Sequence, residues 1–361
     1  MLPAQLYLAI PLSRSIQQDF AVDAGTASWT GGAFSVAYAV GFLLFGPVSD
    51  RVSHRRVLVC AAAAAAVSTA LVGASPGIHW LIALRVVQGL AAAAFPPVAL
   101  AYAAEHAPGG RAPRALAAIT TGLLGSSVAG QVFGQLVADH GSWRTAFVLP
   151  AVLYAAAALA LHRCLAPGRP PRAASWWRPY AMIGPLLRGR GTVAVFATAV
   201  TVFGSLVAVY GALDVHLRDE RHLSGGVLVL VPLIGTAGLA AGPVAGAGRH
   251  GPRTRAACGF LLAAAGLPLV AAPQVAVVLA GSVVFMAGIS LVVPALIGLL
   301  HRMAPTSRGA AVAVHSFVLF LGASLGQLTA SALSFPLVIA LSAAQLVLAA
   351  AVVALFTGPG P

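Results

Sequence analysis

Long apolar segments alternate with short polar connections along nearly the whole chain. Eleven of them are long enough for a helix to cross the hydrocarbon core of a membrane, which takes about 20 apolar residues. We expect these spans at 29–48, 57–75, 79–103, 114–138, 144–164, 192–216, 225–247, 256–272, 275–300, 310–333 and 335–356. The pattern predicts an all-α membrane protein.

A shorter apolar stretch, MLPAQLYLAIPLSRSI, precedes the first of these spans. It carries Pro3, Pro11 and Arg14, and it looks like the outer part of a first helix whose beginning is missing. We therefore expect an architecture of twelve spans in which the first is truncated.

The composition supports a membrane protein. Hydrophobic residues make up 59% of the chain and charged residues only 8%, against about 25% charged residues in an ordinary soluble domain. The net charge of +13 is compatible with nucleic-acid binding. We exclude that class in favour of basic loops that face the cytoplasm and anionic lipids, because all 21 basic residues are arginines clustered between spans.

The distribution of arginines predicts the orientation. Counting the truncated helix as the first span, 16 arginines lie in connections that follow even-numbered spans and only 4 lie in the opposite connections. Cytoplasmic loops carry the excess of basic residues. We therefore expect both chain ends in the cytoplasm and the protein in the inner (plasma) membrane.

The longest connection, 165–191, is rich in proline and arginine and separates two predicted six-helix bundles, 1–164 and 192–361. The bundles share short sequences at one fixed offset. GPVSDRVSHRR begins 196 residues before GPVAGAGRHGPR, and GSSVAGQ ends 196 residues before GASLGQ. Duplicated six-helix halves are typical of secondary transporters, which bind substrate between the halves near the midplane.

The segment GPVSDRVSHRR resembles the loop motif G-x-L-A-D-R-x-G-R-[KR] of the major facilitator superfamily. Four residues occupy motif positions: Gly46, Asp50, Arg51 and Arg55. Ser53 and His54 depart from the motif, and Arg56 restores the second basic charge. The resemblance implies the two-bundle major facilitator fold and transport by alternating access.

We interpret this segment as a conformational latch. Gly46 lets two helices approach closely, and the Asp50 carboxylate faces the positive N-terminal end of a helix of the other half, near 309–311. Arg51, Arg55 and Arg56 then bridge to acids or helix C-termini. The alternative is a loop that only sets topology; we favour the latch because topology requires arginines but no acid.

Arg85 lies inside a predicted span, where a charged side chain is costly. Arg85, Gln88 and Gly89 resemble the R-x-x-Q-G motif of the twelve-span drug/proton antiporters within the superfamily. The resemblance implies that Arg85 faces the cavity and takes part in proton coupling. The alternative is an arginine that extends to the nearby membrane surface.

The span at 114–138 is similar to the antiporter motif G-P-x-x-G-G of these exporters, although Gln131 replaces the proline. Its glycines form a candidate packing seam: Gly122, Gly125, Gly130 and Gly134. An equally acceptable reading is close helix packing without a transport role. Uncharged polar residues at membrane depth are candidates for the substrate cavity: Gln88, Gln131, Tyr210 and Gln327.

Proton coupling needs a titratable group in the cavity. Besides Arg85, the candidates are His315, which lies inside a span, and Asp214, which lies near a span end with His216. Each is alternatively a polar residue at a helix end. The exporters often carry an acid in the first helix, and this chain has none there.

No motif for enzymatic chemistry, a cofactor or a metal is found, and the three cysteines lack metal-ligand spacing. We therefore expect a monomeric transporter without a cofactor whose partners are protons, the lipid bilayer and a small substrate. Proton-coupled efflux of an apolar or amphipathic compound is the favoured function. The alternatives are a proton symporter that imports a nutrient and an inactive or receptor-like membrane protein.

Overall fold

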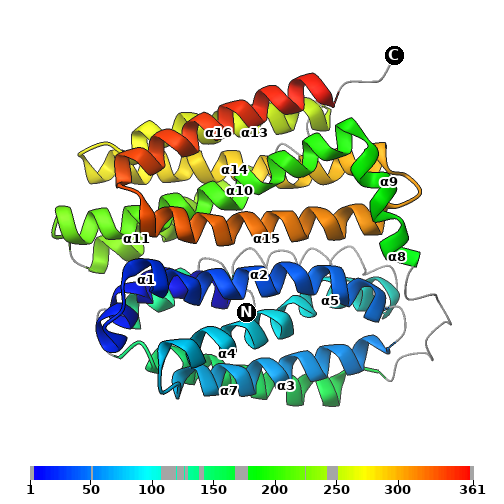
Figure 1. Cartoon of the computed structure of the whole chain (residues 1–361), viewed down its shortest axis with the longest axis horizontal. Coiled ribbons are helices and arrows are strands. Elements are labelled where there is room, and N and C mark those ends of the chain that lie inside the picture. The colour runs from blue at the N-terminus through cyan, green and yellow to red at the C-terminus, as the bar shows by residue number, and fades with distance from the viewer. Residues whose placement is uncertain are drawn as a thin grey trace. The chain divides into compact units, whose positions relative to one another are not determined.

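The computed structural model describes residues 4–49, 52–106, 119, 126, 129–137, 142–166, 178–223, 225–241 and 251–357. The chain divides into two compact units, Met1–Arg178 and Pro179–Pro361. Throughout the described part, the regular elements are helices (Figure 1). The all-α fold that the apolar pattern predicts is confirmed.

Unit 1 contains α1 (Ala4–Phe20), α2 (Ala24–Ser49), α3 (His54–Gly73), α4 (Ile78–Ala93), α5 (Phe95–His106) and α7 (Thr145–Cys164). Helix α2 packs along α4, and α3 packs along α7 (Figure 1). Helices α4 and α5 follow each other with one residue between them and together supply one apolar span, Ile78–Leu100. Pro11 lies within α1.

Unit 2 begins with two short helices in the predicted central connection, α8 (Arg178–Ala181) and α9 (Ile183–Arg188). The longer helices are α10 (Arg190–Val215), α11 (Gly225–Gly235), α13 (Pro252–Val270), α14 (Val275–Met303), α15 (Arg308–Ala332) and α16 (Phe335–Phe356). Helix α10 continues into a π-helical turn, His216–Glu220, and α11 into a 3₁₀ segment, Thr236–Ala240.

Nine helices within the described residues are long and apolar enough to cross a membrane. They correspond to nine of the eleven predicted spans, and the last one begins and ends at the predicted residues, Phe335–Phe356. Most of the predicted span 114–138 lies outside the described residues. In the predicted span 225–247 the α-helix ends at Gly235, a 3₁₀ segment follows to Ala240, and the described residues end at 241.

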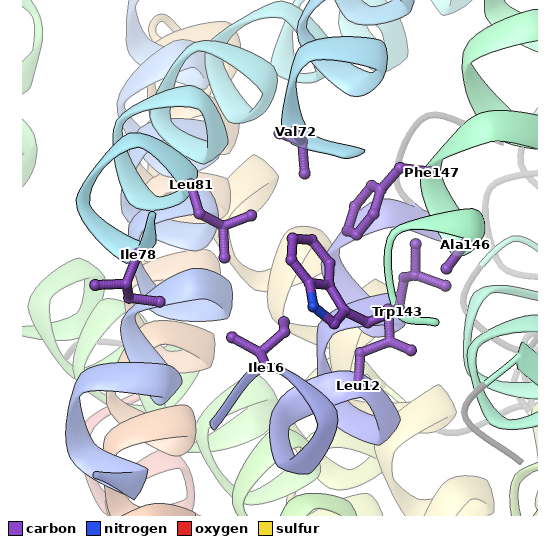
Figure 2. Close-up of a cluster of buried hydrophobic side chains, with 9 residues drawn as sticks. Leu12, Ile16, Val72, Ile78, Leu81, Trp143, Ala146 and Phe147 are labelled. Atoms are coloured by element: carbon purple, nitrogen blue, oxygen red, sulfur yellow. The ribbon is translucent and has the colours of Figure 1, made fainter. Parts of the chain in front are cut away.

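One buried cluster joins four helices of unit 1 (Figure 2). The indole of Trp143 lies among side chains from α1, α3, α4 and α7: Leu8, Leu12, Ile16, Val72, Ile78, Leu81, Ala146 and Phe147. The Trp143 indole N–H donates to Asp19 Oδ2 at 3.1 Å, and Arg144 pairs with the same carboxylate. These contacts fix the end of α1 against the start of α7.

Glycine allows close packing between α10 and α15 in unit 2. A Cβ added to Gly322 would overlap the carbonyl of Val200, and one added to Gly326 would overlap the carbonyl of Gly204. Both helices run in the same direction, since contacts advance together along them. Small residues permit this backbone approach in membrane helices.

The outer faces of α7 and α16 carry exposed apolar side chains, among them Val148, Val152, Leu348 and Leu355. Such continuous apolar surface is unfavourable in water but suits contact with lipid chains. The exposure of these faces therefore agrees with a protein that passes the membrane several times.

Candidate functional site

Arg85 is buried in the centre of unit 1. It lies in the middle of α4, and only 1% of its surface is exposed. A buried cation is stable only when hydrogen bonds or opposite charges compensate for the lost water. Its contacts therefore define the site.

Three hydrogen bonds hold the guanidinium of Arg85. Its Nε donates to the backbone carbonyl of Thr30 in α2 at 2.8 Å, and its Nη2 donates to the carbonyl of Gln5 in α1, also at 2.8 Å. Its Nη1 donates to Gln88 Oε1 at 2.6 Å. The guanidinium carbon also lies 4.4 Å from the ring centroid of Phe34, a cation–π contact. Arg85 thus connects three helices.

A second layer of bonds extends the site to two further helices. Gln88 donates from Nε2 to the Thr69 hydroxyl in α3 at 2.6 Å. Gln5 donates from Nε2 to the Tyr154 hydroxyl in α7 at 3.2 Å. We call this group of residues the arginine site: Gln5, Thr30, Phe34, Thr69, Arg85, Gln88 and Tyr154.

Gly89 explains why the motif R-x-x-Q-G ends in glycine here. A Cβ on Gly89 would overlap the backbone carbonyl of Phe34 and meet the Cβ of Ala37 at 3.1 Å. The absence of a side chain therefore brings α2 close enough for the Arg85 guanidinium to reach the Thr30 carbonyl. Burial and bonding across helices argue against the alternative in which Arg85 extends to the membrane surface.

The latch residues are only partly within the described structure. Gly46 lies in α2, whereas Asp50 and Arg51 lie outside the described residues. Arg55 donates from Nη2 to the carbonyl of His162 in the last turn of α7, and Arg56 is exposed. The Arg55 contact is thus to a helix C-terminus within unit 1.

Unit 2 contains an equivalent contact. Arg253, the second residue of α13, donates to the carbonyl of Ala354, the third residue from the end of α16. Arg55 is likewise the second residue of α3, and His162 is third from the end of α7. The two units therefore repeat one arginine contact at matching helix positions.

The two further candidates for proton coupling differ in their surroundings. His315 is fully buried in α15, and neither ring nitrogen has a hydrogen-bond partner among the described residues. Asp214, near the end of α10, pairs with Arg218 at 3.3 Å. Asp214 is thus part of a local ion pair, whereas the His315 imidazole is buried without polar contacts in the described part of the chain.

The remaining cavity candidates are dispersed. Gln88 belongs to the arginine site. Gln131 lies on the described helical stretch 129–137 and is partly exposed, whereas Tyr210 in α10 and Gln327 in α15 are buried. The Gln327 Nε2 has no hydrogen-bond partner among the described residues.

Two glycines of the predicted packing seam, Gly122 and Gly125, lie outside the described residues. The other two lie against α1. A Cβ on Gly130 would overlap the carbonyl of Ala4, and a Cβ on Gly134 would lie 2.7 Å from Pro11 Cγ. These glycines allow the stretch 129–137 to pack closely on α1.

The sequence identified Arg85 and Gln88 but not their partners Gln5, Thr30 and Thr69. One signal was available, because Gln5 is an amide within an otherwise apolar stretch. The Thr30 contact uses a backbone carbonyl, which every residue possesses, so no residue pattern indicates it.

Comparisons with known proteins show what this chain is similar to. A family model described as the Major Facilitator Superfamily matches residues 3–248. A probable transporter of Streptomyces coelicolor is 29% identical over 272 residues, which is 74% of this chain and 63% of that protein. A tetracenomycin C resistance and export protein of Streptomyces glaucescens is 31% identical over 136 residues, which is 37% of this chain and 25% of that protein.

The fold also matches a solved structure. A nucleoside transporter superposes with a TM-score of 0.75 at 12% sequence identity, over 98% of this chain and 98% of that one. At this identity the likeness shows a shared fold. It agrees with the helical architecture of the described residues.

Proposed function

The chain belongs to the Major Facilitator Superfamily, and we propose that it is a secondary active transporter that exports a small apolar or amphipathic compound in exchange for protons. It works by alternating access without a cofactor or catalytic chemistry. The export activity named for the Streptomyces glaucescens relative favours this direction over import of a nutrient.

The arginine site is the observation that carries this proposal. A buried guanidinium that bonds to α1, α2 and Gln88 costs more than an apolar residue would at the same position. A merely structural helix contact has no need of a charge there. A transporter does, because a fixed charge gives its two conformations different affinities for protons and cargo.

His315 is the proposed proton carrier. Histidine is the side chain whose ordinary pKa lies nearest neutrality, and this imidazole has no polar partner among the described residues. The helices packed against α15 carry other ionisable groups: Arg188, Arg190, Tyr210, Asp214, His301 and Arg302. Asp214 ranks after His315 as a proton carrier, because its carboxylate is already paired with Arg218.

The segment from Gly46 to Arg56 is proposed as the latch that biases the two conformations, with Asp50 as its central group. Gln131, Tyr210 and Gln327 are proposed to offer hydrogen bonds to cargo, in addition to Gln88. We place the protein as a monomer in the inner membrane with both ends in the cytoplasm, as the arginine distribution predicts.

Proton movement measured inside proteoliposomes tests the proposal. Vesicles that contain the purified protein are loaded with a pH-sensitive dye, and tetracenomycin C or a panel of amphipathic compounds is added outside. An antiporter exchanges the entering compound for internal protons, so the lumen becomes alkaline. Acidification indicates a symporter instead, and an unchanged lumen with every compound contradicts proton-coupled transport. Protein-free vesicles are the control.

A further inference from the structure

The buried charge of Arg85 has only neutral hydrogen-bond partners. They are the backbone carbonyls of Gln5 and Thr30 and the side-chain amide of Gln88, with the Phe34 ring beside them. Among the described residues, Arg85 forms no ion pair with a carboxylate. Within the described part of the chain, the buried guanidinium thus has no carboxylate partner.

The sequence shows that this lack of an acid extends through unit 1. No Asp or Glu occurs at 24–49, 52–104, 106–138 or 140–178. The acids that remain there are Asp19, Asp23, Asp50, Glu105 and Asp139, all at or near the ends of apolar segments. Within the five full-length spans predicted for unit 1, Arg85 is the one charged residue that lies away from the span ends.

The two acids nearest the arginine site along the chain are already engaged. Asp19 accepts hydrogen bonds from Trp143 and Arg144. Asp23 accepts from the hydroxyl and the backbone N–H of Thr26, and these bonds hold the pKa of Asp23 below its ordinary value. Thr30 lies seven positions after Asp23, which is about 10 Å along a helix. That separation is too large for direct pairing with Arg85.

Arg85 retains capacity to bind an anion. A guanidinium has five N–H donors, and the three bonds described above use one on each nitrogen. One N–H therefore remains on Nη1 and one on Nη2, and each can donate to a further acceptor such as a carboxylate oxygen.

We infer that the cargo is an amphipathic monoanion whose carboxylate binds Arg85 and displaces the Gln88 amide from it. This inference rests on the proposed transport function and narrows its substrate class. An anion is a stronger partner for a guanidinium than the neutral amide oxygen it replaces. The apolar part of the cargo suits the Phe34 ring and the aliphatic side chains of the spans. While no cargo is bound, the neutral Gln88 amide oxygen accepts the hydrogen bond from Arg85 instead.

A near-isosteric substitution tests the inference directly. Gln88→Glu puts a carboxylate at 2.6 Å from Arg85 Nη1, where the amide oxygen now lies, so the protein supplies its own anion. The control is Gln18→Glu, which adds the same charge at an exposed position of α1. Gln18 is 13 residues from Gln5, about 20 Å along the helix.

The probes are octanoate and octanamide, which have the same chain and differ in charge. Binding to the purified protein in nanodiscs of zwitterionic lipid is measured by calorimetry. We expect octanoate to bind wild type and Gln18→Glu at least about tenfold more tightly than octanamide, as for a charge-assisted pair. In Gln88→Glu the preference disappears.

Equal binding of the two probes to wild type overturns the inference, and so does a preference that survives Gln88→Glu. A third arm titrates sodium chloride. If chloride binds and octanoate does not, the site takes an inorganic ion and the amphipathic cargo is wrong. The wild-type comparison needs no variant, so a folding defect in Gln88→Glu leaves the inference testable.

Failure here is distinguishable from failure of the proposed function. Octanoate preference without proton movement in loaded vesicles contradicts proton-coupled transport and leaves the anion site standing. Proton movement driven by neutral compounds, with no preference for octanoate, contradicts the anion site and leaves transport standing.

Discussion

Gly89 lies directly against the backbone carbonyl of Phe34. One helical turn away on each helix, Arg85 donates to the carbonyl of Thr30. The two contacts are therefore one turn apart along both helices, and α2 and α4 run in the same direction where they pack together. The glycine sets the distance between the helices, and that distance allows the buried arginine to reach its acceptor.

Gly89→Ala tests this dependence. The added methyl group overlaps the Phe34 carbonyl, which is backbone and cannot rotate away, so α2 and α4 must move apart. We expect the free energy of unfolding to fall by about 1–3 kcal/mol, the usual cost of overpacking, and transport to be lost with the Arg85 contact. The measurements are thermal unfolding in detergent and proton movement in vesicles.

Gly77→Ala is the matched control, because a Cβ at the start of α4 meets nothing within 4 Å. It should change the melting temperature much less than Gly89→Ala, since alanine restricts the unfolded chain and its only disadvantage is as a weaker N-cap of α4. If both alanine variants behave alike, the crossing at Gly89 does not set the helix distance.

The close packing of α10 and α15 gives a second prediction. Gly322→Ala overlaps the carbonyl of Val200, whereas Gly309→Ala in the same helix meets nothing within 4 Å. We expect Gly322→Ala to lower the melting temperature through a loss of about 1–3 kcal/mol and Gly309→Ala to have no such effect. A stable Gly322→Ala protein shows that the two helices separate without cost.

The repeated arginine contact gives a third prediction. Arg55→Ala removes the bond to the His162 carbonyl at the end of α7, and Arg253→Ala removes its counterpart at the end of α16. Each loss should cost on the order of 1 kcal/mol or less, because these arginines are partly solvated. Hydrogen exchange should accelerate only in the last turn of α7 or α16, respectively.

Arg56→Ala controls for charge, since Arg56 is exposed and adjacent to Arg55. It should leave exchange in α7 unchanged. Equal acceleration in Arg55→Ala and Arg56→Ala contradicts a specific contact and indicates a general effect of loop charge.

The latch gives a fourth prediction. Asp50→Asn keeps the size of the side chain and removes the charge that is proposed to face a helix N-terminus. We expect normal insertion and an unchanged melting temperature, because the arginines that set topology remain. Transport should fall at least about tenfold, because the variant loses the contact that biases the equilibrium between the two conformations. Normal transport by Asp50→Asn means that the segment sets topology alone.

Much of the fold follows from hydropathy because lipid imposes one simple rule: each span must satisfy its backbone within a helix and present apolar side chains. Phe335–Phe356 was predictable to the residue for this reason. The break after Gly235, where α-helix becomes 3₁₀-helix, was not, because the apolar pattern continues through it.

The sequence predicted the arginine of the site and its motif neighbours but not the backbone acceptors. A charge inside a span draws attention to Arg85, and the motif adds Gln88 and Gly89. The acceptors at Gln5 and Thr30 are backbone carbonyls, whose availability depends on how α1 and α2 cross α4. The packing of the helices in three dimensions determines which carbonyls are available, and the local sequence does not predict it.

His315 gives the last prediction, in which stability and transport respond in opposite ways. The imidazole is fully buried, and its nitrogens have no partner among the described residues. Replacing an unbonded buried polar group with an apolar one of similar size is neutral or stabilising. We therefore expect His315→Leu to melt at the same or a higher temperature while proton movement in vesicles stops. His301→Leu, at an exposed histidine of α14, should change neither property. A His315→Leu protein that melts several degrees lower shows that the imidazole has a structural partner, and one that still moves protons places the carrier elsewhere, with Asp214 as the next residue to test.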